Sequence, residues 1–94
     1  MKPKNLLTYY KGEMDLIADQ VLEHIIDCEP IRKTLLVNDC LNFGICSPAT
    51  TYKKVDILER AGMVNSYVDP KDGRAILLTT TPNGRIRIKV WGKS

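Results

Sequence analysis

Several residue types and patterns are scarce in this chain of 94 residues, which has one histidine, one tryptophan and three cysteines. No stretch approaches the roughly 18 apolar residues that span a bilayer, and the N-terminal residues lack the apolar core of a signal peptide. The sequence also contains no glycine-rich phosphate loop and no nucleophile motif. These absences predict a single cytoplasmic domain without a membrane partner, which is not an enzyme.

The cysteines, Cys28, Cys40 and Cys46, form an odd set without the paired spacing of a metal site. We interpret them as small buried side chains or incidental thiols. An intermolecular disulfide or a redox sensor is the alternative. His24 falls on the polar side of its segment, no cysteine or second histidine is expected to make a metal site with it, and we interpret it as a surface histidine. Neither a cofactor nor a metal is expected.

The net charge of +3 is modest, but its distribution is uneven. Residues 13–29 include Asp15, Asp19 and Glu29 and contain no lysine or arginine, whereas residues 82–94 include Arg85 and Arg87 and contain no acid. The chain therefore has an acidic segment and a basic segment. This asymmetry favours an oriented encounter with a polyanion over uniform attraction.

The stretch 47–62 has the clearest helix signals. Ser47 can cap a helix by accepting a backbone N–H, Pro48 fits the first helical position, and Gly62 can adopt the left-handed conformation that ends helices. Thr51, Val55 and Leu58 follow one another at steps of four and three residues, which places them on one face of the helix. The opposite face contains Thr50, Tyr52, Lys53 and Lys54. Its first two turns contain no acid, although the helix dipole would favour one there. This absence suggests that a negatively charged partner approaches this face, and a DNA major groove is the candidate.

Two helices are expected before this stretch. The first runs from 13 to about 28, because Pro30 disfavours helical geometry at the residue before it. Its apolar stripe contains Met14, Ile17, Ala18, Val21, Leu22, Ile25 and Ile26. The second helix is expected over 31–42, and its apolar set is Leu35, Leu36, Cys40 and Leu41. Arg32 and Lys33 fall in its first turn, which is unfavourable unless a phosphate lies near.

A short turn in which Gly44 can take a positive φ joins the second helix to the stretch 47–62. This arrangement predicts a helix-turn-helix, with any three-helix bundle as the alternative. Residues 63–69 and 74–80 have strand character and 70–73 are turn residues, so a hairpin follows as a wing with Lys71 and Arg74 at its tip. For the tail, Thr81 and Pro82 favour a short helix, whereas the alternation of apolar and basic residues over 85–90 favours a strand. We expect the helix.

The predicted fold class is α+β and mainly α: a winged helix-turn-helix of three helices, a two-stranded wing and a short C-terminal helix or strand. An N-terminal arm over 1–12 precedes the domain, which covers 13–94.

At this point the sequence resembles the winged helix-turn-helix of MarR-type transcriptional regulators, over about residues 31–85. The motifs that carry the resemblance are Leu58-Glu59-x-Ala61-Gly62-Met63-Val64, Asp72-x-Arg74 and Thr81-Pro82-x-Gly84-Arg85. It implies that Arg74 enters or lines a DNA groove while Asp72 holds it by a salt bridge; that the pair only stabilises the turn is the alternative. Such proteins usually have Leu-Thr where Thr80-Thr81 stands here, and they are longer. The long C-terminal helix that helps to frame a ligand pocket is missing, so a small-molecule effector is not expected.

The sequence thus predicts sequence-specific binding of double-stranded DNA by a transcriptional regulator, with helix 47–62 in the major groove and wing 63–80 on the adjacent minor groove or backbone. Phosphates would meet Arg32, Lys33 and Lys54. The full set of predicted DNA-binding residues is Arg32, Lys33, Ser47, Pro48, Ala49, Thr50, Tyr52, Lys53, Lys54, Lys71, Asp72 and Arg74.

A single domain buries only roughly 600–1,000 Å² on DNA, so a homodimer on a two-fold site is expected. The candidate dimer contacts are the arm 1–12, the wide stripe of the first helix, and Trp91. The alternative function is a winged-helix module that binds another protein and no specific DNA sequence. Such a module would not need a helix face free of acids.

Overall fold

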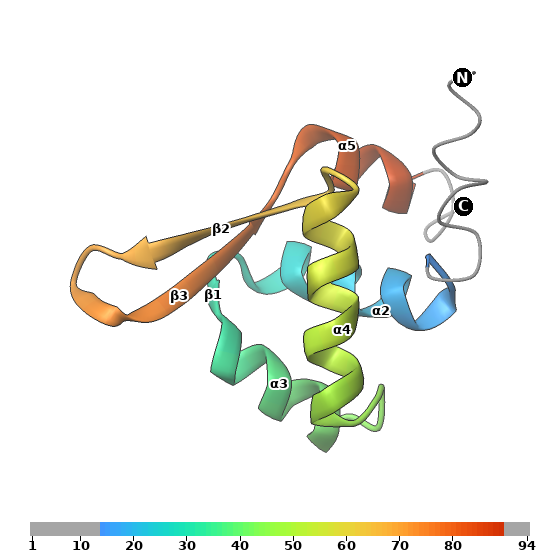
Figure 1. Ribbon diagram of the computed structural model, residues 1–94. Coiled ribbons are helices and arrows are strands. Elements are labelled where there is room, and N and C mark those ends of the chain that lie inside the picture. The colour runs from blue at the N-terminus through green and yellow to red at the C-terminus, as the bar shows by residue number, and fades with distance from the viewer. Residues whose placement is uncertain (1–13, 90–94) are drawn as a thin grey trace.

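The computed structural model describes residues 14–89, which form four helices and three strands (Figure 1). In chain order these are α2 (Leu16–Cys28), β1 (Ile31–Arg32), α3 (Lys33–Asn42), α4 (Pro48–Arg60), β2 (Val64–Asp69), β3 (Asp72–Thr80) and α5 (Pro82–Arg87). The predicted arm over 1–12 and Trp91 lie outside the described residues. None of the helices found between residues 14 and 89 has the length and apolar character needed to cross a membrane.

Helix α4 forms where its capping signals predict it. The N–H of Thr50 donates to Ser47 Oγ at 3.2 Å, and Pro48 occupies the first helical position. Gly62 follows the helix with a φ of +77°, a conformation that side chains other than glycine rarely adopt. The face with Thr51, Val55 and Leu58 is fully buried, as its spacing predicts.

Helix α2 begins at Leu16, slightly later than expected, because Asp15 caps it by accepting the N–H of Ala18 at 3.0 Å. Its predicted stripe forms the centre of the core, with Ala18, Val21, Leu22 and Ile25 fully buried. The interpretation of His24 as a surface histidine is wrong. Its side chain is 16% exposed, its Nε2 lies 2.9 Å from Asp39 Oδ2, and its ring packs edge-on against Phe43. His24 therefore joins α2 to α3.

The second predicted helix starts later than expected, because Ile31 and Arg32 form strand β1. These two residues pair with Leu78 and Leu77 of β3, which makes the sheet three-stranded and antiparallel in the order β1-β3-β2. Two residues are too few to show the alternation that identifies a strand.

The predicted apolar set of the second helix also needs correction. Leu36 and Cys40 are buried as expected, together with Val37, whereas Leu35 and Leu41 are 51% and 53% exposed. After this helix, Gly44 has the positive φ expected of the turn.

The wing and the tail follow the prediction. Strands β2 and β3 pair from Val64↔Thr80 to Asp69↔Asp72, with an irregularity between Val68 and Asp69. Thr81 then caps α5 by accepting the N–H of Gly84 at 3.0 Å, so the helical interpretation of this segment is confirmed. A Cβ at Gly84 would lie 2.3 Å from the carbonyl oxygen of Met63, so the close approach of α5 to the wing's base requires glycine.

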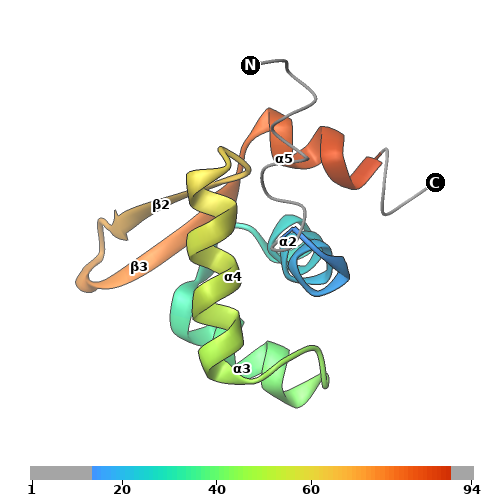
Figure 2. The ribbon, with the colours of Figure 1, turned by 45° about the vertical axis from the view of Figure 1, so that its right-hand side comes forward.

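The elements are arranged so that one end of α4 is left open. Helix α4 crosses α2, with α3 beside its N-terminal end and α5 near its C-terminal end, and the wing projects to one side (Figures 1 and 2). The N-terminal turns of α4, the start of α3 and the hairpin therefore border one face of the molecule. The predicted fold class, a mainly helical winged helix-turn-helix, is confirmed, with β1 added to the two-stranded wing.

Candidate nucleic-acid interface

The N-terminal turns of α4 present an exposed polar face. Ser47, Pro48, Ala49 and Lys53 are exposed, Tyr52 is 48% exposed, and Thr50 is half-buried. The first turn of α4 contains no acid, and Ser47 Oγ donates to Thr50 Oγ1 at 3.1 Å. Hydroxyl, phenol and ammonium groups are therefore available here for hydrogen bonds to a ligand outside the protein.

Lys54 does not belong to this face, and its predicted place there is wrong. It is 8% exposed, and its Nζ lies 3.2 Å from Asp15 Oδ2 at the start of α2. The reason is helical geometry: Lys54 is three residues after Thr51 and next to Val55, so its stem follows the buried side of α4. Its charge holds α4 to α2.

Asp15 makes two interactions: it caps α2, and it pairs with Lys54. Burial acts to raise the pKa of its carboxyl. The hydrogen bond from the Ala18 N–H, and the hydrogen bond and positive charge of Lys54, act in the opposite direction, and the pKa lies below its ordinary value of 3.8. The carboxylate is therefore ionised at neutral pH.

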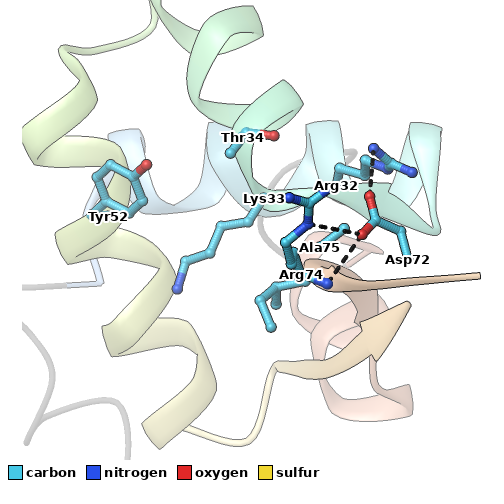
Figure 3. A pocket seen from close by; sticks show the side chains of 8 residues that line it. Arg32, Lys33, Thr34, Tyr52, Asp72, Arg74 and Ala75 are labelled. Carbon is cyan, nitrogen blue, oxygen red and sulfur yellow. Dashed lines mark hydrogen bonds and ion pairs between the residues drawn. The ribbon is translucent and has the colours of Figure 1, made fainter. Parts of the chain in front are cut away.

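A hollow of about 310 Å³ lies between α3, α4 and the wing (Figure 3). Its lining residues are Arg32, Lys33, Thr34, Tyr52, Asp72, Arg74, Ala75 and Ile76. Three of these side chains are cations and one is an acid. The Nζ of Lys33 lies 5.8 Å from the centre of the Tyr52 ring, a cation–π contact that directs this lysine toward α4. The hollow therefore joins the polar face of α4 to the wing through a basic surface.

At the tip of the wing, Arg74 extends into solvent with its side chain 97% exposed. Its Nε lies 3.8 Å from Asp72 Oδ1, and its backbone N–H donates to the same oxygen at 3.1 Å. Asp72 thus makes the expected salt bridge and also stabilises the turn. Lys71 donates its backbone N–H to Asp69 Oδ1 at 2.9 Å, which leaves its side chain outside the turn's own hydrogen bonds.

Arg32, which the sequence predicts to meet phosphates, has its guanidinium engaged within the protein. Its Nη2 lies 3.4 Å from Asp69 Oδ2, and its Nη1 lies 3.9 Å from Asp72 Oδ2. Asp69 is the residue of this group that sequence reasoning missed. Its contact with Arg32 spans 37 positions of sequence, so no local pattern could reveal it.

The basic segment at the end of the chain is also engaged. Arg85 forms an ion pair with Glu29, and Arg87 Nε lies 2.6 Å from Asp19 Oδ1. Arg87 is 8% exposed and donates a further hydrogen bond to the carbonyl of Met14 at 3.1 Å. The expectation of separate acidic and basic ends is therefore wrong for these residues, because the two segments neutralise each other.

The three cysteines are free thiols. Cys40 is fully buried, and burial raises the pKa of its thiol to about 11, against the opposing effect of the Thr51 hydrogen bond. Cys46 is half-buried with its Sγ 3.2 Å from Thr51 Oγ1, and Cys28 is exposed. Between residues 14 and 89 no group of histidine, cysteine and acidic side chains is placed to hold a metal ion.

No family model and no curated protein sequence matches the chain. Solved structures do. The PcaV transcriptional regulator of Streptomyces coelicolor, determined with its natural ligand, superposes with a TM-score of 0.74 at 23% identity over 86% of this chain and 55% of that one. FabT of Streptococcus pneumoniae, in complex with DNA, gives 0.72 at 14% identity over 96% and 66%. MepR of S. aureus, also with DNA, gives 0.74 at 14% identity over 96% and 69%.

These similarities show that the architecture is a winged helix-turn-helix. More narrowly, the fold is that of the MarR-type regulators, since a structure of MarR itself superposes with a TM-score of 0.70 at 21% identity over 94% of this chain. The fold implied by the sequence resemblance is thereby confirmed. The chain spans 55% of PcaV and 63% of MarR, so it corresponds to part of their length.

Proposed function

We propose that this chain is a transcriptional regulator, not an enzyme, that binds double-stranded DNA in a sequence-specific manner. The observation that carries the proposal is the exposed, acid-free N-terminal face of α4 beside a basic hollow and a wing tipped with Arg74. An α-helix fits the major groove, and cations on either side of it can bind phosphates. FabT, MepR and a mutant of E. coli MarR were each solved with DNA, which supports the same role for this fold.

The proposed roles follow the position of each residue. Base edges in the major groove meet the start of α4, whose exposed or half-buried residues are Ser47, Pro48, Ala49, Thr50, Tyr52 and Lys53. Lys33, in the hollow, binds a phosphate, and its contact with the Tyr52 ring keeps it beside α4. Lys71 and Arg74 reach the adjacent minor groove or backbone, with Asp72 holding Arg74. Lys54 is left out because it is buried against Asp15.

We further propose that the protein binds as a homodimer, because one module offers only roughly 600–1,000 Å² to DNA and useful affinity needs two. Exposed apolar side chains at the start of α2 and on α5, Leu16 at 72% and Ile86 at 58%, are available for such a contact. Sedimentation equilibrium of the full chain tests this, and a monomer at the concentrations used for DNA binding would contradict it.

The test of DNA binding is fluorescence anisotropy with random duplex DNA at several salt concentrations. Wild type is compared with Lys53→Ala and Arg74→Ala, and with Lys89→Ala as a matched control. Lys89 is an exposed cation just after α5, and it lies beside Ile26, Arg85 and Ile88, none of which lines the hollow. We expect affinity to fall steeply with salt and the slope of log K against log salt to decrease by about 1 in each of the two test variants. Lys89→Ala should match wild type.

Absence of binding by the wild type, or equal loss in all three variants, would contradict the proposal. A wild type that binds no DNA would direct attention to a winged-helix module for protein interaction. If binding is found, selection of duplexes from a random pool then tests sequence specificity, since phosphate contacts alone would enrich no sequence.

A further inference from the structure

Arg32 joins the body of the domain to the tip of the wing. It is the last residue of β1 and directly precedes α3, and its backbone lies opposite Leu77 of β3. From this position its two terminal nitrogens reach different carboxylates, Nη2 that of Asp69 at 3.4 Å and Nη1 that of Asp72 at 3.9 Å. One side chain thus contacts both strands of the wing where the hairpin turns.

The two acids also shape the turn itself. Asp69 Oδ1 accepts the backbone N–H of Lys71 at 2.9 Å, and Asp72 Oδ1 accepts that of Arg74 at 3.1 Å. Each carboxylate therefore binds the turn through one oxygen and faces Arg32 through the other. Figure 3 shows Asp72 between Arg32 and Arg74, while Lys33 extends away toward α4.

Without Arg32, this arrangement would be electrostatically unfavourable. Asp69 and Asp72 are Cα partners in the antiparallel ladder, so two like charges stand opposite each other, and such pairs destabilise a hairpin. The Asp69 side chain is 12% exposed, which makes a compensating cation more important. Arg32 supplies that cation. A DNA phosphate would therefore have to compete with two carboxylates for its guanidinium.

We propose that Arg32 is a positioning residue, which holds the wing in place so that Arg74 is presented to DNA, and that it does not bind a phosphate itself. The inference rests on the proposed function. A planar guanidinium can serve two carboxylates at once, whereas the ammonium of lysine is a single point of charge. Arginine is thus required at position 32, and the charge alone does not suffice.

This distinction defines the test. Arg32→Lys keeps the positive charge and loses the double contact, so a phosphate-binding role predicts nearly unchanged DNA binding. The positioning role predicts a loss similar to that of Arg74→Ala and the same decrease of about 1 in the salt slope. The double variant Arg32→Lys/Arg74→Ala should bind no more weakly than Arg74→Ala alone, because Arg32 acts through Arg74.

Lys33→Ala, at the neighbouring position, is the matched control. As a direct phosphate contact it should weaken binding independently, so its effect and that of Arg74→Ala should add. Thermal unfolding of each variant checks that it is folded. A partly unfolded sample would reduce the bound amplitude and leave the salt slope unchanged, which separates loss of structure from loss of a contact.

Two outcomes would overturn the inference while leaving DNA binding intact. These are an Arg32→Lys variant with wild-type affinity and slope, and additive effects of Arg32→Lys and Arg74→Ala. A wild type that binds no DNA would overturn both this inference and the proposed function, so the two failures are distinguishable.

Discussion

Two groups of basic residues in this domain have similar chemistry and different surroundings. At the open face, Lys53, Lys71 and Arg74 point their charges outward, and within residues 14–89 neither lysine has an ion-pair partner. In the other group, Lys54 and Arg87 are buried against Asp15 and Asp19, and Arg85 is paired with Glu29. The two groups differ in exposure: Arg74 keeps its charge in solvent even beside Asp72, whereas Lys54 and Arg87 are buried with their acids. This difference separates cations that are available to a polyanion from cations that hold the fold.

The paired group shows why residues 13–29 are acidic. Asp15 receives a lysine from α4, and Asp19 receives an arginine from α5, so two distant parts of the chain are fixed to the start of α2. A buried ion pair is favourable only when further hydrogen bonds satisfy its groups. Arg87 meets that condition through the Met14 carbonyl. In the exposed group, Arg74 faces Asp72 while its side chain is 97% exposed, and Lys53 and Lys71 have no ion pair within residues 14–89, so these cations would gain most from phosphates.

The largest effect that follows from this comparison is expected at Arg87. Arg87→Met keeps much of the apolar stem and removes the charge, so Asp19, whose side chain is only 17% exposed beside Arg87, loses its partner. We expect the free energy of unfolding to fall by about 2–3 kcal/mol, because an uncompensated carboxylate remains in a largely buried place. Urea denaturation measures this, with Lys53→Met as the exposed control. A change smaller than about 0.5 kcal/mol, the range of ordinary surface substitutions, would contradict the structural role of this arginine.

The neighbours Lys53 and Lys54 sharpen the comparison within one turn of helix. Lys54→Met should lower the free energy of unfolding by about 1–2 kcal/mol and leave the salt slope of DNA binding unchanged, since its Nζ is engaged with Asp15. Lys53→Met should leave stability within about 0.5 kcal/mol and reduce the salt slope by about 1. Measuring both quantities on both variants tests the assignment. If both lysines change the slope, Lys54 has been assigned to the wrong group.

These two lysines also mark how far the sequence could predict the structure. Helix ends were predictable, because Ser47, Pro48 and Thr81 are local signals that act through the nearest backbone groups. The sides of α4 were not fully predictable, because Lys54 lies at the border of the buried face, and only a distant carboxylate decides where its charge points.

Contacts between distant residues account for the other differences. Arg87 lies 68 positions from Asp19, and Arg32 lies 37 from Asp69, so composition and periodicity treat all four as surface charges. For a related reason, the sequence pattern did not predict strand β1. Its two residues carry no pattern of their own, and their conformation is set by pairing with β3. The exposed first turns of α4 and the exposed tip of the wing follow the prediction, because each depends on a single local element.

The smallest expected effect concerns pH and Asp15. Its pKa is lowered in the folded state, despite the opposing effect of burial, by the Ala18 N–H and by Lys54. A group whose pKa is lower when folded contributes stability above its unfolded value, near 3.8, and loses that contribution as the pH falls through the folded value. Asp15→Asn keeps a side chain that can cap α2 and removes the charge, so it isolates this contribution.

We therefore expect wild type to exceed Asp15→Asn in the free energy of unfolding at pH 7, by less than about 1 kcal/mol because the carboxylate is 42% exposed. The difference should shrink below about pH 4 and vanish once Asp15 is protonated in both states. Urea denaturation at a series of pH values measures it. In Lys54→Met, the same Asp15→Asn substitution should have a smaller effect at pH 7, because the partner is gone. An equal effect in both backgrounds would mean that Asp15 stabilises α2 as a cap alone, and that the charge of Lys54 is not what holds α4 to α2.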